Sequence, residues 1–392
     1  MRNIIYVLFS VFLIGVIFNM CVPAPTVEKE GTGKIEKDSL KRRKALEYVS
    51  IAVEYYRRKN YERALENFLE AIKIDSTLYA AIIGAARTYQ DLRDISNAED
   101  MYRRAIELHP DSVSGYLGLG GVYLAIGKCD SAILIYEEGL KHDSTETDFY
   151  LGIAKAYERM EKKYKADSIY KKGIQVNPDD LALRNHYADF LLKQKRYKEA
   201  LENLLLIIER YPEDIIAREK IADIYVELKN YKKAKEHYEF ILSKKPDDTD
   251  ILVKLGEMYL RRRNYKKAKA YFIKAVEIKP HDPAVRLHLA DLYITTRSFG
   301  KADSVLKEIL QIQKDYPPAF ALYGELYTQK AVYAAKIKKW KEGKRYCEIA
   351  LSYFYKIKGD PNFSSYANKK IEYLTKLKKR CEKEIWFKEG GK

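Results

Sequence analysis

The six residues NYKKAK occur at positions 230–235 and again at positions 264–269, one 34-residue interval later. When the chain is written in lines of 34 residues from Ala45, eight lines follow without a gap to Tyr316. Small residues fill two places in every line. The eighth place holds Ala52, Ala86, Gly120, Ala154, Ala188, Ala222, Gly256 and Ala290, and the twentieth holds Ala64, Ala98, Ala132, Ala166, Ala200, Ala234, Ala268 and Ala302. Self-similarity at a fixed period predicts a repeat architecture.

Each line has the pattern of two helices. Apolar residues recur every three or four positions in two stretches, which are separated by a short polar turn such as Lys229-Asn230. Small residues allow two antiparallel helices to approach closely, and Tyr at the eleventh place of most lines fills the space beside them. A single hairpin leaves most of its apolar face exposed, so stacking of hairpins is needed to make a continuous core.

This pattern resembles the tetratricopeptide repeat family over residues 45–316. The family's framework is matched by Ala188, Ala200 and Pro212 in one line and by Gly256, Tyr259, Ala268, Phe272 and Pro280 in another. Arg184, Arg218 and Arg286 stand at the fourth place, where the family often has Trp. The resemblance implies an all-α, right-handed superhelical solenoid of antiparallel helix hairpins. It also implies a concave groove, lined by the first helices, that binds proteins or peptides.

The array is expected to continue with a ninth, lengthened repeat at residues 317–359. Trp340 matches the seventeenth place but stands seven residues late, and seven residues are two helical turns, so the apolar faces keep their orientation. After Asp360-Pro361, an amphipathic stretch from Ser364 to Trp386 predicts a capping helix, followed by a basic tail, within residues 360–392.

Residues 1–21 have the pattern of a signal peptide or membrane anchor. The apolar run from Ile4 to Phe18 makes a helix of about 22 Å, shorter than the roughly 30 Å of a hydrocarbon core. Its ending resembles a bacterial lipoprotein signal, which implies acylation of Cys21, although Met20 is larger than the residue expected there. Lipidation is favoured over an uncleaved anchor or a soluble exported form. All three place the protein in the cell envelope, outside the cytoplasm. Residues 22–44 predict a flexible charged linker.

Charge is distributed unevenly along the chain, which has 72 Lys+Arg and 56 Asp+Glu. Residues 45–146 carry a net −6, whereas residues 249–392 carry a net +16, concentrated in runs such as KIKKWKEGKR (336–345). One interpretation is solvated helix faces whose lysine stems cover apolar surface. The other is a basic end that contacts anionic lipid or an acidic partner. Nucleic acid is disfavoured as a partner, because no base-reading module is visible.

A row of charges at 34-residue spacing is the candidate binding site. Acidic residues stand at the ninth place (Asp189, Asp223, Glu257, Asp291 and Glu325), and His186, Lys220, Lys254 and His288 stand three residues earlier in four of these lines. The family resemblance places these positions in the groove. Pairs such as Lys220 with Asp223 could simply stabilise their own helix. Alternatively, the acidic and basic rows read an extended charged peptide.

No catalytic or metal-binding pattern stands out. The segment GYLGLGGVY (115–123) lacks the strand and the Lys-Ser/Thr of a phosphate loop, and the histidines have no i,i+4 pair. Cys347 and Cys381 lie on neighbouring predicted helices, and a disulfide between them is left open. The sequence therefore predicts no enzyme and no cofactor. It predicts a non-catalytic scaffold that binds protein or peptide partners and serves assembly of an envelope complex. The alternatives are a chaperone-like holder of exported unfolded chains and docking of the basic end on an anionic membrane.

Overall fold

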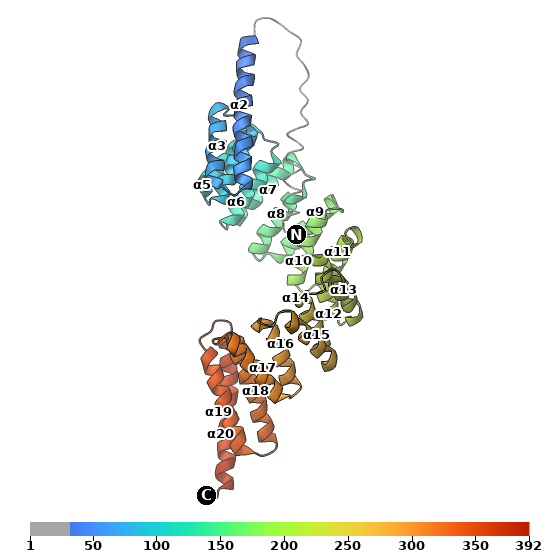
Figure 1. Cartoon of the computed structure of the whole chain (residues 1–392). Helices are drawn as coiled ribbons and strands as arrows, with labels where there is room; N and C mark the ends of the chain where they lie inside the picture. The colour runs from blue at the N-terminus through green and yellow to red at the C-terminus, as the bar shows by residue number, and fades with distance from the viewer. Residues whose placement is uncertain (1–31, 392) are drawn as a thin grey trace. The chain divides into compact units, whose positions relative to one another are not determined.

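The computed structural model describes residues 32–391, and over this range the chain forms nineteen helices and no strand (Figure 1). The predicted all-α solenoid of helix hairpins is confirmed. The chain divides between Leu183 and Arg184 into two compact units.

The first unit contains α2 (Thr32–Arg57), α3 (Tyr61–Ile74), α4 (Tyr79–Asp91), α5 (Ile95–Leu108), α6 (Val113–Ala125), α7 (Cys129–His142), α8 (Thr147–Arg159) and α9 (Lys163–Val176). The boundary lies in the first turn of α10 (Leu181–Lys193). The second unit continues with α11 (Tyr197–Arg210), α12 (Ile215–Glu227), α13 (Tyr231–Lys244), α14 (Thr249–Arg261), α15 (Tyr265–Ile278), α16 (Pro283–Thr295), α17 (Phe299–Ile312), α18 (Pro317–Lys336), α19 (Trp340–Ile357) and α20 (Ser364–Lys388).

Helix starts follow the period of the sequence. From α4 to α18 each first helix of a hairpin begins one repeat length after the last, and the second helices do the same from α3 to α17. Residues of both small columns are buried. At Gly256, an added Cβ would lie 2.3 Å from the ring of Phe272, so the absence of a side chain lets the two helices of this hairpin approach closely. The small columns are therefore the contact line of each hairpin.

The repeated NYKKAK stretch forms the turn and the start of the second helix. Asn264 is the N-cap of α15, where its side chain accepts a hydrogen bond from the backbone N–H of Lys267 at 3.2 Å. The preceding Arg263 has φ 57°, in the left-handed region. The Lys267 ammonium lies 5.2 Å from the ring centroid of Tyr259, the eleventh-place tyrosine of the same repeat. Asn230 and Lys233 make the corresponding contacts one repeat earlier.

At the fourth place, where the family often has Trp, the planar guanidinium groups of Arg218 and Arg286 make the local contacts. The Arg218 guanidinium lies 3.7 Å from the ring centroid of Phe240 and donates to the carbonyl of Pro212 at 2.7 Å. Arg286 donates to the carbonyl of Pro280 at 2.9 Å. A planar guanidinium both stacks on an aromatic ring and donates hydrogen bonds, so these repeats keep their packing at this place.

The last repeat is lengthened. Helix α18 has 20 residues, whereas the first helices of repeats two to eight have 13, and α19 has 18 residues. Helix α20 packs on α19 and buries Ala367, Leu374 and Cys381, which recur at every seventh position. Cys347 and Cys381 are both buried free thiols, so the disulfide left open by the sequence is not formed.

The prediction of a flexible linker over residues 22–44 is wrong from Thr32 onward, where the chain is helical. Helix α2 begins at Thr32 and runs without a break into the first repeat, where Ala45 is fully buried. Lys, Glu, Leu and Arg in this segment favour helix, and no Pro or Gly follows Gly33 to end it before Ala45. Residues 22–31, like the apolar run and Cys21, lie outside the described residues.

Candidate functional site

The charged row of the second unit links successive repeats. Lys220 pairs with Asp189, and Lys254 pairs with Asp223 at 2.6 Å, in each case across to the preceding repeat. His288 lies 3.3 Å from Glu257 in the same arrangement. Of the two interpretations of the row, pairing of Lys220 with Asp223 inside one helix is not what the structure shows, since Lys220 pairs with Asp189. First helices of neighbouring repeats lie beside one another, and a sixth-place cation reaches the ninth-place carboxylate of the preceding repeat.

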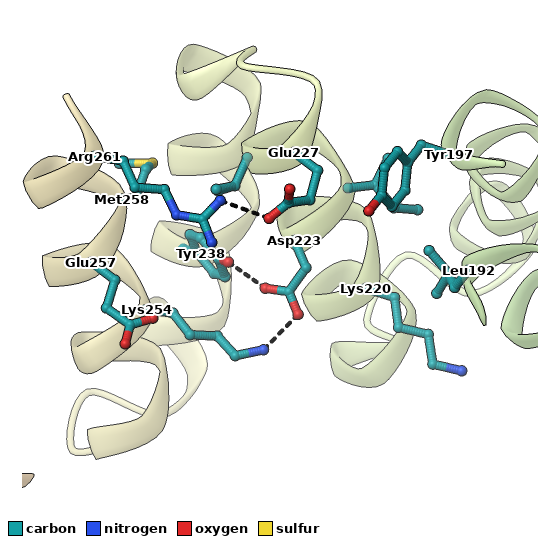
Figure 2. A pocket seen from close by; sticks show the side chains of 12 residues that line it. Leu192, Tyr197, Lys220, Asp223, Glu227, Tyr238, Lys254, Glu257, Met258 and Arg261 are labelled. Carbon is teal, nitrogen blue, oxygen red and sulfur yellow. Dashed lines mark hydrogen bonds and ion pairs between the residues drawn. The ribbon is translucent and has the colours of Figure 1, made fainter. Parts of the chain in front are cut away.

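A hollow of about 330 Å³ lies along this row, over α10 to α14 (Figure 2). Charged side chains at its edge are Lys220, Asp223, Glu227, Lys254, Glu257 and Arg261. Between them lie the apolar side chains of Leu192, Ile224, Val226 and Met258 and the rings of Tyr197 and Tyr238. Apolar surface flanked by ionic groups suits an extended peptide that places an apolar side chain between charged ones.

Lys254 is the centre of the ionic network in the hollow. It donates to Asp223 at 2.6 Å and to Glu219 at 2.7 Å. Burial by itself lowers the pKa of Lys254, but the hydrogen bonds to the two carboxylates outweigh burial, and the pKa lies above its ordinary value. The Tyr238 hydroxyl donates to the other oxygen of Asp223, and burial together with this bond raises the pKa of Tyr238. Asp223 is thus held by groups from two other helices.

A second ion pair, between Arg261 and Glu227, lies at one end of the hollow. Arg261 pairs at 2.6 Å with Glu227 of the preceding repeat, and both side chains are about half exposed (Figure 2). Near the opposite edge, Lys220 also donates to the side-chain oxygen of Asn185 at 3.0 Å. The charges at the edge are neutralised in pairs. A charged group of a ligand therefore has to displace one member of a pair before it can bind the other.

Asp291 differs from the other members of the row. The next repeat has Leu322 at the sixth place, and no cation or hydrogen-bond donor within the described chain contacts the Asp291 carboxylate. Burial raises the pKa of Asp291, and Glu325 and Glu257 raise it further, against an opposing effect of His288. Glu325 itself pairs at 2.5 Å with Lys370 of α20, so the capping helix ends the row.

Of the predicted groove residues, Lys220, Asp223, Lys254 and Glu257 line the hollow, whereas Asp189, Asp291 and Glu325 do not. Sequence reasoning missed Glu219, Glu227, Tyr238 and Arg261. Glu227 and Arg261 occupy the thirteenth place of adjacent repeats, and opposite charges in one column could have revealed that pair. Tyr238 occupies a place that is aromatic in most repeats and was indistinguishable from a core residue.

Two kinds of feature are absent from residues 32–391. Nowhere in this range do three or more His, Cys, Asp or Glu side chains gather as metal ligands would. Within the same residues, no helix combines the length and the apolar character that crossing a membrane requires.

The repeats match known sequence families. Three family models described as tetratricopeptide repeat match residues 48–78, 83–147, 147–180, 220–283 and 259–326, which together exceed half of the chain. The chain is a tetratricopeptide repeat protein. A comparison with curated protein sequences gave no match.

Solved structures, two of them described as tetratricopeptide repeat proteins, are similar to parts of the chain. A tetratricopeptide repeat protein from Parabacteroides merdae is 17% identical, with a TM-score of 0.43, and the match covers 64% of this chain and 98% of that one. YrrB, described as a tetratricopeptide repeat protein with an unusual peptide-binding site, is 21% identical with a TM-score of 0.41 and coverages of 47% and 94%. PilF of Pseudomonas aeruginosa is 22% identical with a TM-score of 0.40 and coverages of 56% and 96%.

Proposed function

We propose that this protein is a non-catalytic scaffold of the bacterial cell envelope that binds a protein or peptide segment in the hollow of repeats five to seven. Tetratricopeptide repeats are generally protein-interaction scaffolds. The observation that carries the proposal is the combination of an apolar floor with ionic edges over α10, α12 and α14. Assembly of an envelope complex is the process that such a scaffold would serve.

The expected ligand is an extended segment with an apolar side chain flanked by charged ones. The apolar side chain fills the space above Ile224 and Met258. The flanking charges exchange with the Lys254–Asp223 and Arg261–Glu227 pairs. Exchange of one ion pair for another costs little, because both states keep each charge partnered, and it makes binding depend on the order of charges in the ligand.

A charge exchange tests this proposal. Glu227→Arg combined with Arg261→Glu keeps the ion pair and the net charge of the protein but reverses the field at the end of the hollow. A matched control exchanges Glu54 and Arg58, which pair at 2.8 Å on α2 of the first unit. The probe is a fluorescent peptide that a random phage-displayed library yields against the wild-type chain, and binding is measured by anisotropy.

We expect the Glu227/Arg261 exchange to weaken peptide binding at least tenfold, which corresponds to about 1.4 kcal/mol, while the Glu54/Arg58 exchange leaves it unchanged. Circular dichroism checks that both variants fold. Equal affinity of wild type and the Glu227/Arg261 variant, or a library that yields no binding peptide, would contradict the proposal. Weak binding of many unrelated apolar peptides would favour the chaperone-like holder, for which the apolar floor of the hollow is the supporting observation.

The envelope location rests on residues 1–21 of the sequence. We expect labelled fatty acid to be incorporated at Cys21, more strongly after Met20→Gly, since a small residue is expected before the acylated cysteine. Cys21→Ala should abolish the label. A wild-type chain that never takes up labelled fatty acid would remove the lipoprotein proposal and leave the uncleaved anchor or the soluble exported form.

A further inference from the structure

The capping helix α20 carries an exposed aromatic stripe. The helix buries the seam of Ala367, Leu374 and Cys381, and side chains of its outer face are exposed. Three aromatic side chains are exposed on it: Tyr373, Trp386 and Phe387, the last two by 50% and 56%. Tyr366 instead faces the repeats, where its hydroxyl donates to Glu325 of α18 at 3.1 Å. Tyr373 and Phe387 stand fourteen positions apart, about four helical turns, so they lie on the same side of the helix.

Unpaired cations border this stripe. Lys369, Lys379, Arg380, Lys383 and Lys388 are exposed, and none of them forms an ion pair with any residue that the structure describes. The exposed Glu372 is neutralised by Lys376 at 2.5 Å, and Glu382 pairs with Lys344 at 3.3 Å. Lys383 lies 5.6 Å from the ring centroid of Phe387. The outer face therefore combines net positive charge with aromatic surface.

This combination is the one that the headgroup region of a bilayer accommodates. Trp and Tyr have an apolar body and a polar tip, and Lys keeps its ammonium in water while its stem lies on apolar surface. A helix of 25 residues is about 37 Å long, so one face of α20 meets many headgroups at once. Phosphates of anionic lipids complement the unpaired ammonium groups.

We propose that the outer face of α20 docks on an anionic lipid surface, with its lysines on the phosphates and with Trp386 and Phe387 at headgroup depth. This docking goes beyond the peptide site in the hollow and does not rest on it, because α20 contributes no residue to that hollow. It gives the C-terminal end of the chain a membrane contact of its own, separate from any anchor at the N-terminus.

The test measures co-sedimentation of the full-length chain with vesicles of phosphatidylcholine alone and with vesicles that also contain phosphatidylglycerol. One variant combines Lys369→Gln, Lys379→Gln and Lys383→Gln. Its control combines Lys232→Gln, Lys266→Gln and Lys274→Gln, three exposed lysines of the sixth and seventh repeats, and changes the net charge equally. Comparison with neutral vesicles separates the contribution of the apolar N-terminal run.

We expect stronger binding to anionic than to neutral vesicles for the wild type. The α20 variant should lose about 100-fold in the anionic partition coefficient, at about fivefold per lysine, and the control about twofold. Trp386→Ala with Phe387→Ala should weaken anionic binding further without changing the circular dichroism spectrum. Equal partition into both vesicles, or equal losses in the α20 and control variants, would overturn the proposal. So would binding of poly-glutamate through the α20 lysines without selectivity for anionic vesicles, which would indicate an acidic protein partner.

Discussion

Replacement of Lys254 by Met tests the role of the charged row in stability. Lys254 lies on α14, and its ammonium forms ion pairs with both Asp223 and Glu219 of α12. Met keeps the length and the apolar stem of the side chain, so the change removes the ion pairs and little packing. Asp223 keeps its hydrogen bond from Tyr238, whereas Glu219 loses its partner.

The magnitude follows from the exposure of the groups. The Lys254 side chain is 29% exposed and those of Glu219 and Asp223 are 37% and 45% exposed, so solvent screens each pair. Pairs of this kind contribute about 0.5–1 kcal/mol each. With two carboxylates left without their cation, we expect a loss of about 1–2 kcal/mol at the contact of repeats six and seven. A double-mutant cycle with Asp223→Asn should give a coupling of about 0.5–1 kcal/mol.

Hydrogen exchange is the suitable assay, because repeat arrays can open locally and a single unfolding free energy is then poorly defined. Amides of α12 to α15 should exchange about 5–30-fold faster in the Lys254→Met variant. Molar salt should reduce the difference in exchange rate between the variant and the wild type, because salt screens the Lys254 ion pairs that only the wild type has. Lys266→Met on α15 is the control, because Lys266 is exposed and has no ion pair within the described chain. Exchange rates that match those of the control, or a difference that does not change with salt, would refute the reasoning.

Three other substitutions follow from the structure. Arg263→Gly should raise the free energy of unfolding by about 0.5–1 kcal/mol, because Arg263 has φ 57° and Gly takes this conformation without steric cost; an unchanged or lowered urea midpoint would contradict this. Phe354→Ala removes a fully buried ring and should cost about 3–5 kcal/mol, with faster hydrogen exchange in α18 to α20 and unchanged exchange in the first unit. Burial raises the pKa of Asp291 above its unfolded value, so its ionisation opposes folding above the folded-state pKa. Asp291→Asn should therefore stabilise the protein at neutral pH, and this gain should vanish as the pH falls below the ordinary Asp pKa of about 3.9; urea midpoints that show no gain at pH 7 would speak against it.

The helix boundaries were predictable because the same local constraints return in every repeat. A small residue at the eighth and twentieth places and a left-handed turn residue occur in each of the eight lines and act within one hairpin, so position in the line predicts helix, turn and contact. The start of α2 was not predictable in this way. Residues 32–44 lie before the first line and have no repeat partner, and the charged residues that suggested a linker are also good helix formers.

The candidate site was only partly predictable for a different reason. A charge pattern shows which residues share a column, and this was enough to find Lys220, Asp223, Lys254 and Glu257. A charge pattern does not show which charged residue the hydroxyl of a buried tyrosine reaches. The hydrogen bond from Tyr238 to Asp223 could therefore be found only from the structure. The charge pattern also does not show that Glu227 and Arg261 point toward each other across neighbouring helices.

The period of the sequence by itself determined an array of helix hairpins, because each hairpin carries small and aromatic residues at fixed places and buries its apolar face only by stacking on its neighbours. Only the tertiary structure decided how the charged row is used. Lys254 stands one helical turn from Glu257 in its own helix, whereas Asp223 belongs to the preceding repeat, and the sequence spacing favours the nearer carboxylate. Stacking of α14 against the preceding repeat brings the distant one to 2.6 Å instead, and so turns the row into links between repeats.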